Sequence, residues 1–237
     1  MLTDIHSHIL HNIDDGPENF EQSVELLNKS IQNGVQNIIA TPHFYASRHS
    51  LNDRLQKTEE RYKELIDHIS KNNIDVSILK GFEVRYFDGI SHSDSLLELS
   101  INRSGVLLLE LEPSTITEKV VDEILNMNYS GCNVILAHIE RYIKVPGFKY
   151  IKNLIAEGEV ISQCNASSFI SGSLQRATFK LLKENMVSVI AGDMHSVDIR
   201  PPKLKEAYEI IERKFGLNVK NKLIFKAEEI FNSCLEK

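Results

Sequence analysis

Two histidines near the N-terminus, His6 and His8, have the spacing of a metal-binding pair. They follow the apolar run Leu2–Ile5, which predicts a strand, and alternate side chains of a strand point to the same face. Both imidazoles would therefore face one way, and imidazole is a ligand for zinc, iron, manganese and related ions. A carboxylate, Asp15, follows in the next loop. One His-x-His pair is weak evidence by itself, so its weight depends on the rest of the chain.

Similar side chains recur at the ends of the later predicted strands, in the segments ATPHF, KGFEVRY, LLLELEP, ILAHIER and IAGDMH. The candidate ligands are five histidines and four carboxylates: His6, His8, Asp15, His43, Glu83, Glu110, His138, Asp193 and His195. Burying so many ionisable groups together is costly without compensating positive charge, which divalent metals supply. Nine ligands are too many for one ion and suit two or three ions bridged by a carboxylate. Spacing alone does not separate Glu110 from Glu112, which faces the same side of its strand.

The elements that must position these side chains alternate between strand and helix along the whole chain. The predicted strands cover Leu2–His6, Asn37–His43, Val76–Val84, Val106–Glu112, Asn133–His138, Val160–Asn165 and Val187–Asp193. Helical spacing of apolar residues predicts helices at Phe20–Asn33, Leu51–Lys71, Glu118–Asn128, Lys149–Glu157, Ser173–Glu184, Leu204–Phe215 and Leu223–Leu235. No linker or repeat interrupts this order, so we expect a single domain over residues 1–237.

Alternating strands and helices predict an α/β fold with parallel βαβ units, in either a closed barrel or a doubly wound sheet. An open sheet concentrates its site at a switch point between two or three strands. A barrel instead brings the carboxyl end of every strand to one rim. Because six of the seven predicted strands end in a candidate ligand, the pattern favours a seven-stranded barrel.

The composition argues against several classes of function. A net charge of -6 does not suit a nucleic-acid-binding surface, which needs a basic face. No run of about 18 apolar residues occurs, so no membrane insertion is expected. The N-terminus lacks a signal-peptide pattern, and cleavage would remove His6, so a cytoplasmic location is expected. Cys132, Cys164 and Cys234 lack the C-x5-R loop of cysteine-dependent phosphatases and are predicted to be small buried residues.

The motifs DIHSHIL, DDGP, ATPHF, GFEVR, AHIER and GDMH resemble the polymerase and histidinol phosphatase (PHP) superfamily. Within it, they look most like the manganese-dependent bacterial protein-tyrosine phosphatases of capsular and exopolysaccharide operons. The most specific element is DIHSHIL with DDGP, followed by IIATPHF. The resemblance covers nearly the whole chain. It implies a distorted (β/α)7 barrel, similar to a TIM barrel, with a cluster of up to three metal ions. Manganese is expected, and iron, zinc or cobalt are alternatives.

The resemblance also implies roles for single residues. The three ions would be held by His6, His8, Glu83 and Asp193, by Glu83, Glu110 and His138, and by Asp15, His43 and His195. Asp193 would share the catalytic centre with Arg141 and Arg200, whose side chains would bind the phosphate. Two departures from the usual motifs AHPER and SDAH are Ile139 in the first, and Gly192 and Met194 in the second. They are expected to affect pocket shape and substrate preference more than metal binding.

The implied reaction is hydrolysis of phosphotyrosine in a protein, with a bacterial tyrosine kinase that regulates capsule or exopolysaccharide synthesis as the expected substrate. Metal ions would lower the pKa of a water toward ~7, and the resulting hydroxide would attack phosphorus. No extra general acid is evident, which mildly favours a phenolate leaving group with a parent pKa near ~10. Alternatives are a histidinol-phosphate phosphatase and a non-catalytic regulator that binds phosphotyrosine. The sequence does not indicate an oligomeric state.

Overall fold

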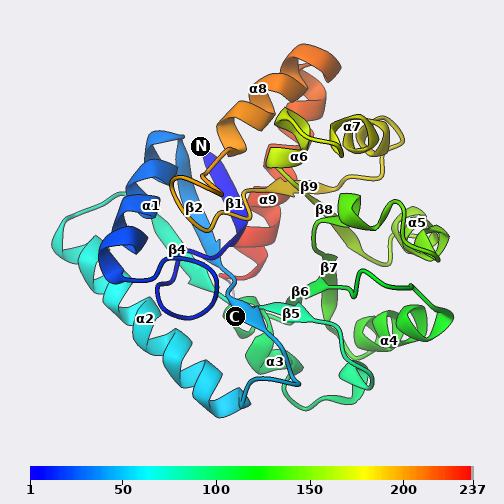
Figure 1. The fold of residues 1–237 in the computed structure, drawn as a ribbon, viewed down its shortest axis with the longest axis horizontal. Helices are drawn as coiled ribbons and strands as arrows, with labels where there is room; N and C mark the ends of the chain where they lie inside the picture. The colour runs from blue at the N-terminus through cyan, green and yellow to red at the C-terminus, as the bar shows by residue number, and fades with distance from the viewer. Residues whose placement is uncertain (236–237) are drawn as a thin grey trace.

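A computed structural model of the protein describes residues 1–235, in which strands form a ring with helices outside it (Figure 1). The strands are β1 (Leu2–Ser7), β2 (Val35–Ala40), β3 (His43–Phe44), β4 (Ser77–Lys80), β5 (Glu83–Arg85), β6 (Val106–Glu110), β7 (Asn133–Leu136), β8 (Ile161–Asn165) and β9 (Val189–Ala191). The α-helices are α1 (Phe20–Gln32), α2 (Leu51–Lys71), α3 (Leu96–Leu99), α4 (Glu118–Tyr129), α5 (Phe148–Ala156), α6 (Ser167–Ile170), α7 (Gln175–Lys183), α8 (Leu204–Phe215) and α9 (Leu217–Ser233). Short 3-10 helices are η1 (Ile90–His92), η2 (Ile101–Arg103) and η3 (Ile139–Tyr142).

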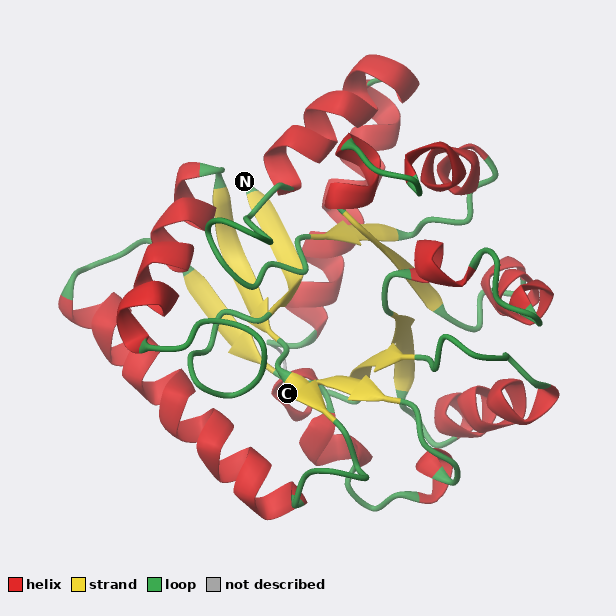
Figure 2. Ribbon diagram, viewed as in Figure 1, coloured by secondary structure: helices red, strands yellow, loops and turns green. Residues whose placement is uncertain are grey.

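The strands are parallel and form two sheets, in the orders β1-β2-β4 and β3-β5-β6-β7-β8-β9 (Figure 2). Outside these ladders, one parallel bridge joins Ser7, at the end of β1, to Met194, beyond β9. The predicted α/β architecture is therefore confirmed, although the ladders within residues 1–235 form two sheets rather than one continuous barrel. The parallel order brings the carboxyl ends of the strands to one rim.

Two of the seven predicted strands are each broken into a pair, which is why the structure has more strands than expected. Between β2 and β3, Pro42 has no N–H with which to continue a ladder. Between β4 and β5, a Cβ at Gly81 would lie 2.8 Å from the Cα of Ile101, so a larger residue would displace that backbone. These breaks transfer His43 and Glu83 to the six-stranded sheet, where they are paired in register.

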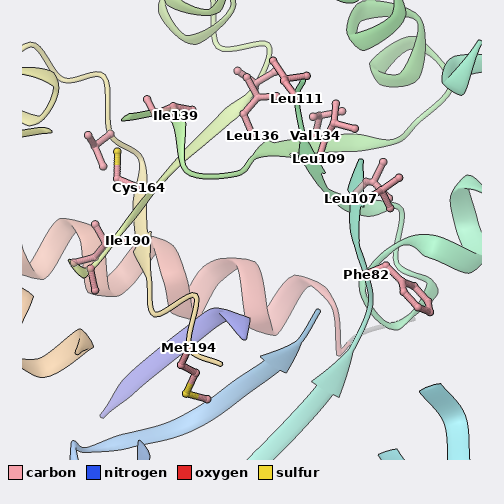
Figure 3. Packing of buried hydrophobic residues seen from close by; sticks show 14 of the residues in the cluster. Phe82, Leu107, Leu109, Leu111, Val134, Leu136, Ile139, Cys164, Ile190 and Met194 are labelled. Atoms are coloured by element: carbon pink, nitrogen blue, oxygen red, sulfur yellow. The ribbon is translucent and has the colours of Figure 1, made fainter. Parts of the chain in front are cut away.

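Alternate residues of the strands pack in opposite directions. On β6 and β7, Leu107, Leu109, Val134 and Leu136 belong to the larger cluster of buried apolar residues, which lies between the strands and the surrounding helices (Figure 3). We call this cluster the outer core. A second cluster, which we call the interior core, combines the other strand faces with helix α9. Its buried members are Ile5, Ile39, Leu79, Ile101, Val106, Leu108, Ile135, Ala137, Val189, Ala191, Ala227, Ile230, Phe231 and Cys234. Helix α9 therefore closes the interior of the ring, and in Figure 1 it crosses behind the strands.

Helix α9 begins six residues before its predicted start at Leu223, directly after Gly216. Gly216 has φ of 87°, a conformation that glycine adopts readily, and it separates α8 from α9. The one-turn helices α3 and α6 were not predicted, because four residues carry too little periodicity to detect. The remaining predicted helices differ by no more than two residues at either end. None of the helices within residues 1–235 has the length and apolarity required to cross a bilayer.

Candidate metal centre

Glu83 lies at the centre of the predicted ligands. Its Oε2 is 3.4 Å from Nε2 of His6 and 3.3 Å from Nε2 of His8. The same oxygen is 2.8 Å from Nδ1 of His43, and Oε1 is 2.8 Å from Nε2 of His138. Burial alone would raise the pKa of Glu83, but the surrounding imidazoles, led by His6 and His138, hold it well below its usual range. Glu83 is therefore an ionised carboxylate with both oxygens facing nitrogen ligands.

The structure brings all nine candidate ligands to one rim. Their atoms form three groups within 4.8 Å: His8, Asp15, His43 and His195; His6, His8 and Asp193; and His43, Glu83 and Glu110. His138 adjoins the last group, with Nε2 3.5 Å from Oε1 of Glu110. The grouping differs from the implied assignment because His8 and His43 each belong to two groups. Glu112 lies outside: its side chain is 55% exposed and faces Arg85, whereas that of Glu110 is 9% exposed.

Several buried polar atoms at this rim lack the hydrogen bonds that would satisfy them. Nε2 of His6 and Nε2 of His8 are 3.3 Å apart in a buried position. Oε2 of Glu83, Oε2 of Glu110 and Nδ1 of His43 are buried without a well-oriented hydrogen bond, despite the short Glu83–His43 contact. Native proteins rarely leave such atoms unsatisfied. Converging acceptors of this kind fit divalent cations, and the mixture of imidazole and carboxylate suits manganese, iron, zinc or cobalt.

Hydrogen bonds behind the candidate ligands orient two of the histidines. Nδ1 of His8 is 2.7 Å from Oδ2 of Asp14, and Nδ1 of His6 is 3.3 Å from Oε1 of Gln163. Because these oxygens accept, each Nδ1 carries a proton and each Nε2 is the ring nitrogen that faces the centre. Oε1 of Gln163 also accepts the backbone N–H of His138 at 2.8 Å. Carboxylate and amide partners of this kind usually accompany metal-binding histidines.

Asp193 connects the histidine cluster to two arginines. Its Oδ1 lies 3.5 Å from Nε2 of both His6 and His8. Its Oδ2 accepts from Nη2 of Arg141 at 2.8 Å and from Nη2 of Arg200 at 2.6 Å. The arginine side chains are 41% and 35% exposed, so each keeps donors open to solvent. The two guanidinium groups therefore form a cationic edge directly beside the candidate ligands.

The unusual residues of the AHIER and GDMH motifs belong to the protein core rather than to an open pocket. Ile139 and Met194 are fully buried in the outer core (Figure 3). At Gly192 a Cβ would lie 2.2 Å from Oδ2 of Asp4, whose Oδ1 accepts the Gly192 N–H at 2.8 Å. A larger residue at position 192 would therefore displace the carboxylate of Asp4, which lies against this backbone. These residues act on the loop that carries Asp193 through packing.

The CpsB/CapC family, whose description is capsular polysaccharide synthesis, has a profile that matches residues 2–232. The chain belongs to this family. It is 30% identical to the tyrosine-protein phosphatase CpsB of Streptococcus agalactiae, over 95% of this chain and 96% of the relative. It is 25% identical to the tyrosine-protein phosphatase YwqE of Bacillus subtilis, over 96% and 90% of the two chains. The predicted family resemblance is therefore confirmed.

Solved structures support the same fold. A chain from the crystal structures of YwqE from B. subtilis and CpsB from Streptococcus pneumoniae, described as metal-dependent tyrosine phosphatases, has a TM-score of 0.85. Sequence identity is 24%, with 98% of this chain and 95% of that chain covered. A histidinol phosphate phosphatase from Lactococcus lactis has a TM-score of 0.56 at 14% identity, covering 90% and 94% of the two chains. These likenesses confirm the predicted PHP-type fold of this CpsB/CapC chain.

Three residues that orient the centre were missed from the sequence. Asp14 was passed over in favour of its neighbour Asp15, although its Oδ2 also accepts the backbone N–H of His43 at 2.9 Å. Gln163 and Asn165 lie on β8, which corresponds to the predicted strand Val160–Asn165, the one of the seven predicted strands that does not end in a candidate ligand. Nδ2 of Asn165 donates to Oδ2 of Asp193 at 2.5 Å. The sequence of this CpsB/CapC chain does contain one indication of Gln163 and Asn165, because two amide side chains alternate at the end of a buried strand.

Backbone conformation at the rim could not be expected from the sequence. Asp193 has φ of 50° and His138 has φ of 34°, both in the left-handed region that residues with a Cβ avoid. Such conformations cost of order 1–3 kcal/mol each and cluster at functional sites. The strain therefore coincides with two candidate ligands.

Among the histidines without an assigned role, His11 lies outside the ligand cluster. Its Nε2 is 3.1 Å from a carboxylate oxygen of Glu64.

Proposed function

We propose that this CpsB/CapC chain is a metal-dependent protein-tyrosine phosphatase. The observation that carries the proposal is the position of Arg141 and Arg200, which share one oxygen of Asp193 at the edge of the candidate ligand cluster. A phosphoryl group placed there would meet planar guanidinium donors on one side and cation-binding groups on the other. Relatives of the family named tyrosine-protein phosphatases support the same activity.

The proposed metal ligands are His6, His8, Asp15, His43, Glu83, Glu110, His138, Asp193 and His195, which would hold up to three ions, with manganese as the proposed native metal. When bound, such ions supply a water of lowered pKa and positive charge for the phosphoryl oxygens. The protein itself prepares the ligands. Burial lowers the pKa of His138 to about 4, so its imidazole is neutral at neutral pH. Nη1 of Arg200 lies 2.7 Å from Nε2 of His195, a contact that orients this imidazole at the edge of the centre.

The arginines would bind and orient the phosphate. Their exposed donors can form two-pronged contacts to phosphoryl oxygens, which fixes phosphorus for attack in line with the leaving oxygen. As the bond from water oxygen to phosphorus forms, the bond from phosphorus to the phenolic oxygen breaks. Tyrosine leaves as a phenolate with a parent pKa near ~10, which needs little help from a general acid. Asp193 would position both arginines through its Oδ2.

The proposed substrate is a cytoplasmic phosphotyrosine protein, namely a bacterial tyrosine kinase that regulates capsule or exopolysaccharide synthesis. Support comes from the family's description, capsular polysaccharide synthesis, and from the names of the relatives. An acidic protein with a net charge of -6 can still attract a phosphate dianion, because the two exposed guanidinium groups act locally.

The test is a steady-state assay on metal-stripped protein with manganese added back. A phosphotyrosine peptide and histidinol phosphate are compared at equal concentrations, and bound metal is measured in parallel. We expect metal-dependent turnover that strongly favours the peptide, and loss of both turnover and bound metal in His6→Ala. A preference for histidinol phosphate would overturn the substrate. Bound metal without turnover of either compound would instead support a non-catalytic regulator.

A further inference from the structure

A cavity of about 270 Å³ opens between the loop that follows β3 and the end of β5. We call it the arginine pocket and define it by six of its lining residues: Tyr45, Arg48, Arg85, Tyr86, Phe87 and Glu112. Pockets for whole small-molecule ligands have volumes of about 300–1,000 Å³. The arginine pocket is smaller and therefore suits a single side chain.

The arginine pocket adjoins the candidate metal centre through two direct contacts. The ring of Tyr45 stacks on that of His43, with centroids 5.0 Å apart and an interplanar angle of 26°. Nε of Arg85 is 2.9 Å from Oε2 of Glu110. An extended peptide advances about 3.3 Å per residue. A side chain one to three residues from a phosphotyrosine bound at the centre would therefore reach this pocket.

The lining of the arginine pocket is cationic and aromatic. The guanidinium groups of Arg48 and Arg85 lie 5.4 Å and 5.3 Å from the ring centroid of Tyr45. Arg85 already has carboxylate partners, because Oε1 of Glu112 is 3.6 Å from Nη1 in addition to the contact with Glu110. Arg48 is exposed and forms no ion pair with any residue in the described range 1–235. Its charge is therefore available to a ligand.

The turn that carries Arg48 is held in place before any ligand binds. The carbonyl oxygen of Tyr45 accepts the backbone N–H groups of Arg48 and His49, each at 2.9 Å. The N–H of Tyr45 donates to Nδ1 of His49 at 3.0 Å, and the two rings stack with centroids 5.6 Å apart. Ordering a loop on binding weakens affinity, so a preformed turn favours recognition by this arginine.

The other cavity beside the centre has the opposite charge. A cleft of about 460 Å³ is lined by Arg200 and by four carboxylates, Asp15, Glu18, Glu25 and Asp198, so acidic groups outnumber the cation. Asp15 is one of the candidate ligands, but the other three belong to the cleft itself. An anionic residue of a substrate would be repelled there and attracted to the arginine pocket. The charge difference gives a bound peptide a preferred orientation.

We propose that the arginine pocket binds an anionic side chain of the phosphoprotein substrate, one to three residues from the phosphotyrosine. The group is a carboxylate or the phosphate of a second phosphotyrosine, which share the guanidinium-binding chemistry. The proposal rests on the proposed phosphatase function and names a sequence preference of that same site.

The experiment compares kcat/KM of the manganese-loaded protein on phosphotyrosine peptides of equal length. Flanking positions carry Glu, Gln, Lys or a second phosphotyrosine. Variants are Arg48→Gln, Arg48→Glu and, as a matched loss of one exposed arginine elsewhere, Arg213→Gln on α8. For the wild type we expect the Glu peptide to exceed the Gln peptide about three- to fivefold, as for a partly exposed ion pair. The preference disappears in Arg48→Gln and turns toward Lys in Arg48→Glu.

The outcomes separate this proposal from the phosphatase function. Turnover of all peptides without a charge preference overturns the arginine pocket alone, and so does a preference that Arg48→Gln retains. An equal loss in Arg213→Gln also overturns it, because long-range charge would then be the cause. No turnover of any phosphotyrosine peptide defeats the phosphatase function instead. Faster cleavage of the doubly phosphorylated peptide than of the Glu peptide would identify phosphate as the preferred anion, and the reverse would identify carboxylate.

Discussion

The interior core and the candidate metal centre at the rim both contain fully buried side chains but have opposite chemistry. Phe231, within the interior core, is 2% exposed, and Glu83 at the rim is 1% exposed. Burying an aromatic side chain such as Phe231 stabilises a fold by about 1.5–3 kcal/mol without any partner beyond close packing. Burying a carboxylate such as Glu83 without full compensation costs several kcal/mol. The same strands thus carry one region that is stable by itself and another that we expect to depend on added cations.

Fold and activity should therefore respond to different perturbations. The interior core consists of apolar side chains from the strands and α9, so its contribution to stability does not depend on solutes. The rim combines carboxylates with imidazoles whose ring nitrogens converge. Changes at the rim should therefore alter metal affinity and turnover, and changes in the interior core should alter the free energy of unfolding.

Removal of the metal should have the largest effect of the changes considered. We expect chelation to abolish turnover of a phosphotyrosine peptide while the helical circular dichroism spectrum is retained. Unfolding should also become easier by about 3 kcal/mol relative to protein with metal at 100 times its Kd. The measurements are peptide hydrolysis and thermal unfolding with and without chelator. Full activity in metal-free protein would contradict the proposed role of the rim.

The substitution Phe231→Ala should affect only the interior core. Loss of this buried ring from α9 should lower the free energy of unfolding by about 3–5 kcal/mol. Turnover per folded molecule at low temperature should remain near that of the wild type. Phe225→Ala is the matched control, because Phe225 lies on the same helix and is 66% exposed. Denaturant unfolding measures both variants, and equal losses of stability would show that α9 does not depend on its buried face.

The substitution Arg141→Ala should affect only the rim. We expect kcat/KM on a phosphotyrosine peptide to fall by about 10²–10³-fold, because one charged donor to the phosphoryl group is lost. Metal content should be unchanged, since Arg141 contacts Asp193 through the oxygen that faces away from the histidines. Arg213→Ala, on the exposed side of α8, serves as the control. A decrease in bound metal equal to the decrease in activity would make Arg141 a structural residue.

The substitution Gln163→Leu tests whether a residue that is not itself a candidate ligand orients the ligands at the rim. Without its amide, His6 and His138 lose a shared partner, and metal affinity should fall by about 10–100-fold. Gln163→Glu keeps an acceptor oxygen and should recover part of the affinity. Manganese titration of each metal-stripped variant gives the Kd. If Gln163→Leu acted only through a change in general packing, Gln163→Glu would not recover the affinity. Identical affinities in the wild type and Gln163→Leu would refute an orienting role.

Periodicity and motif spacing predicted most of the fold and the membership of the candidate site. Long elements such as α2 and α8 were predicted with their observed bounds, because apolar spacing persists over several turns. The breaks at Pro42 and Gly81 were missed, since a continuous apolar run conceals a change of sheet. The choice of Glu110 over Glu112 also needed the structure. It depends on β6 ending at Glu110, a boundary that spacing does not define.

The orienting residues were harder to predict for a different reason. Gln163 acts through a hydrogen bond to His6, which is remote in the sequence, whereas Asp14 bonds to His8 within the same loop segment but also to the backbone of the more distant His43. A single Asp or Gln in a sequence carries no periodic signal, so its partner becomes evident only from tertiary contacts. The left-handed conformations of His138 and Asp193 are likewise imposed by their surroundings rather than by residue type.

The contact between His6 on β1 and Asp193 beyond β9 has a consequence for the order of events during biosynthesis. Most of the described chain lies between these two residues, and β1 also packs on α9. On the ribosome, β1 must wait for the last strand and helix to emerge before its surroundings are complete. Capture of the proposed metal would thus be a late step, and we expect an unfinished chain to compete poorly for manganese in the cell. Availability of the ion after release of the finished protein, rather than during translation, would set how much of it becomes active.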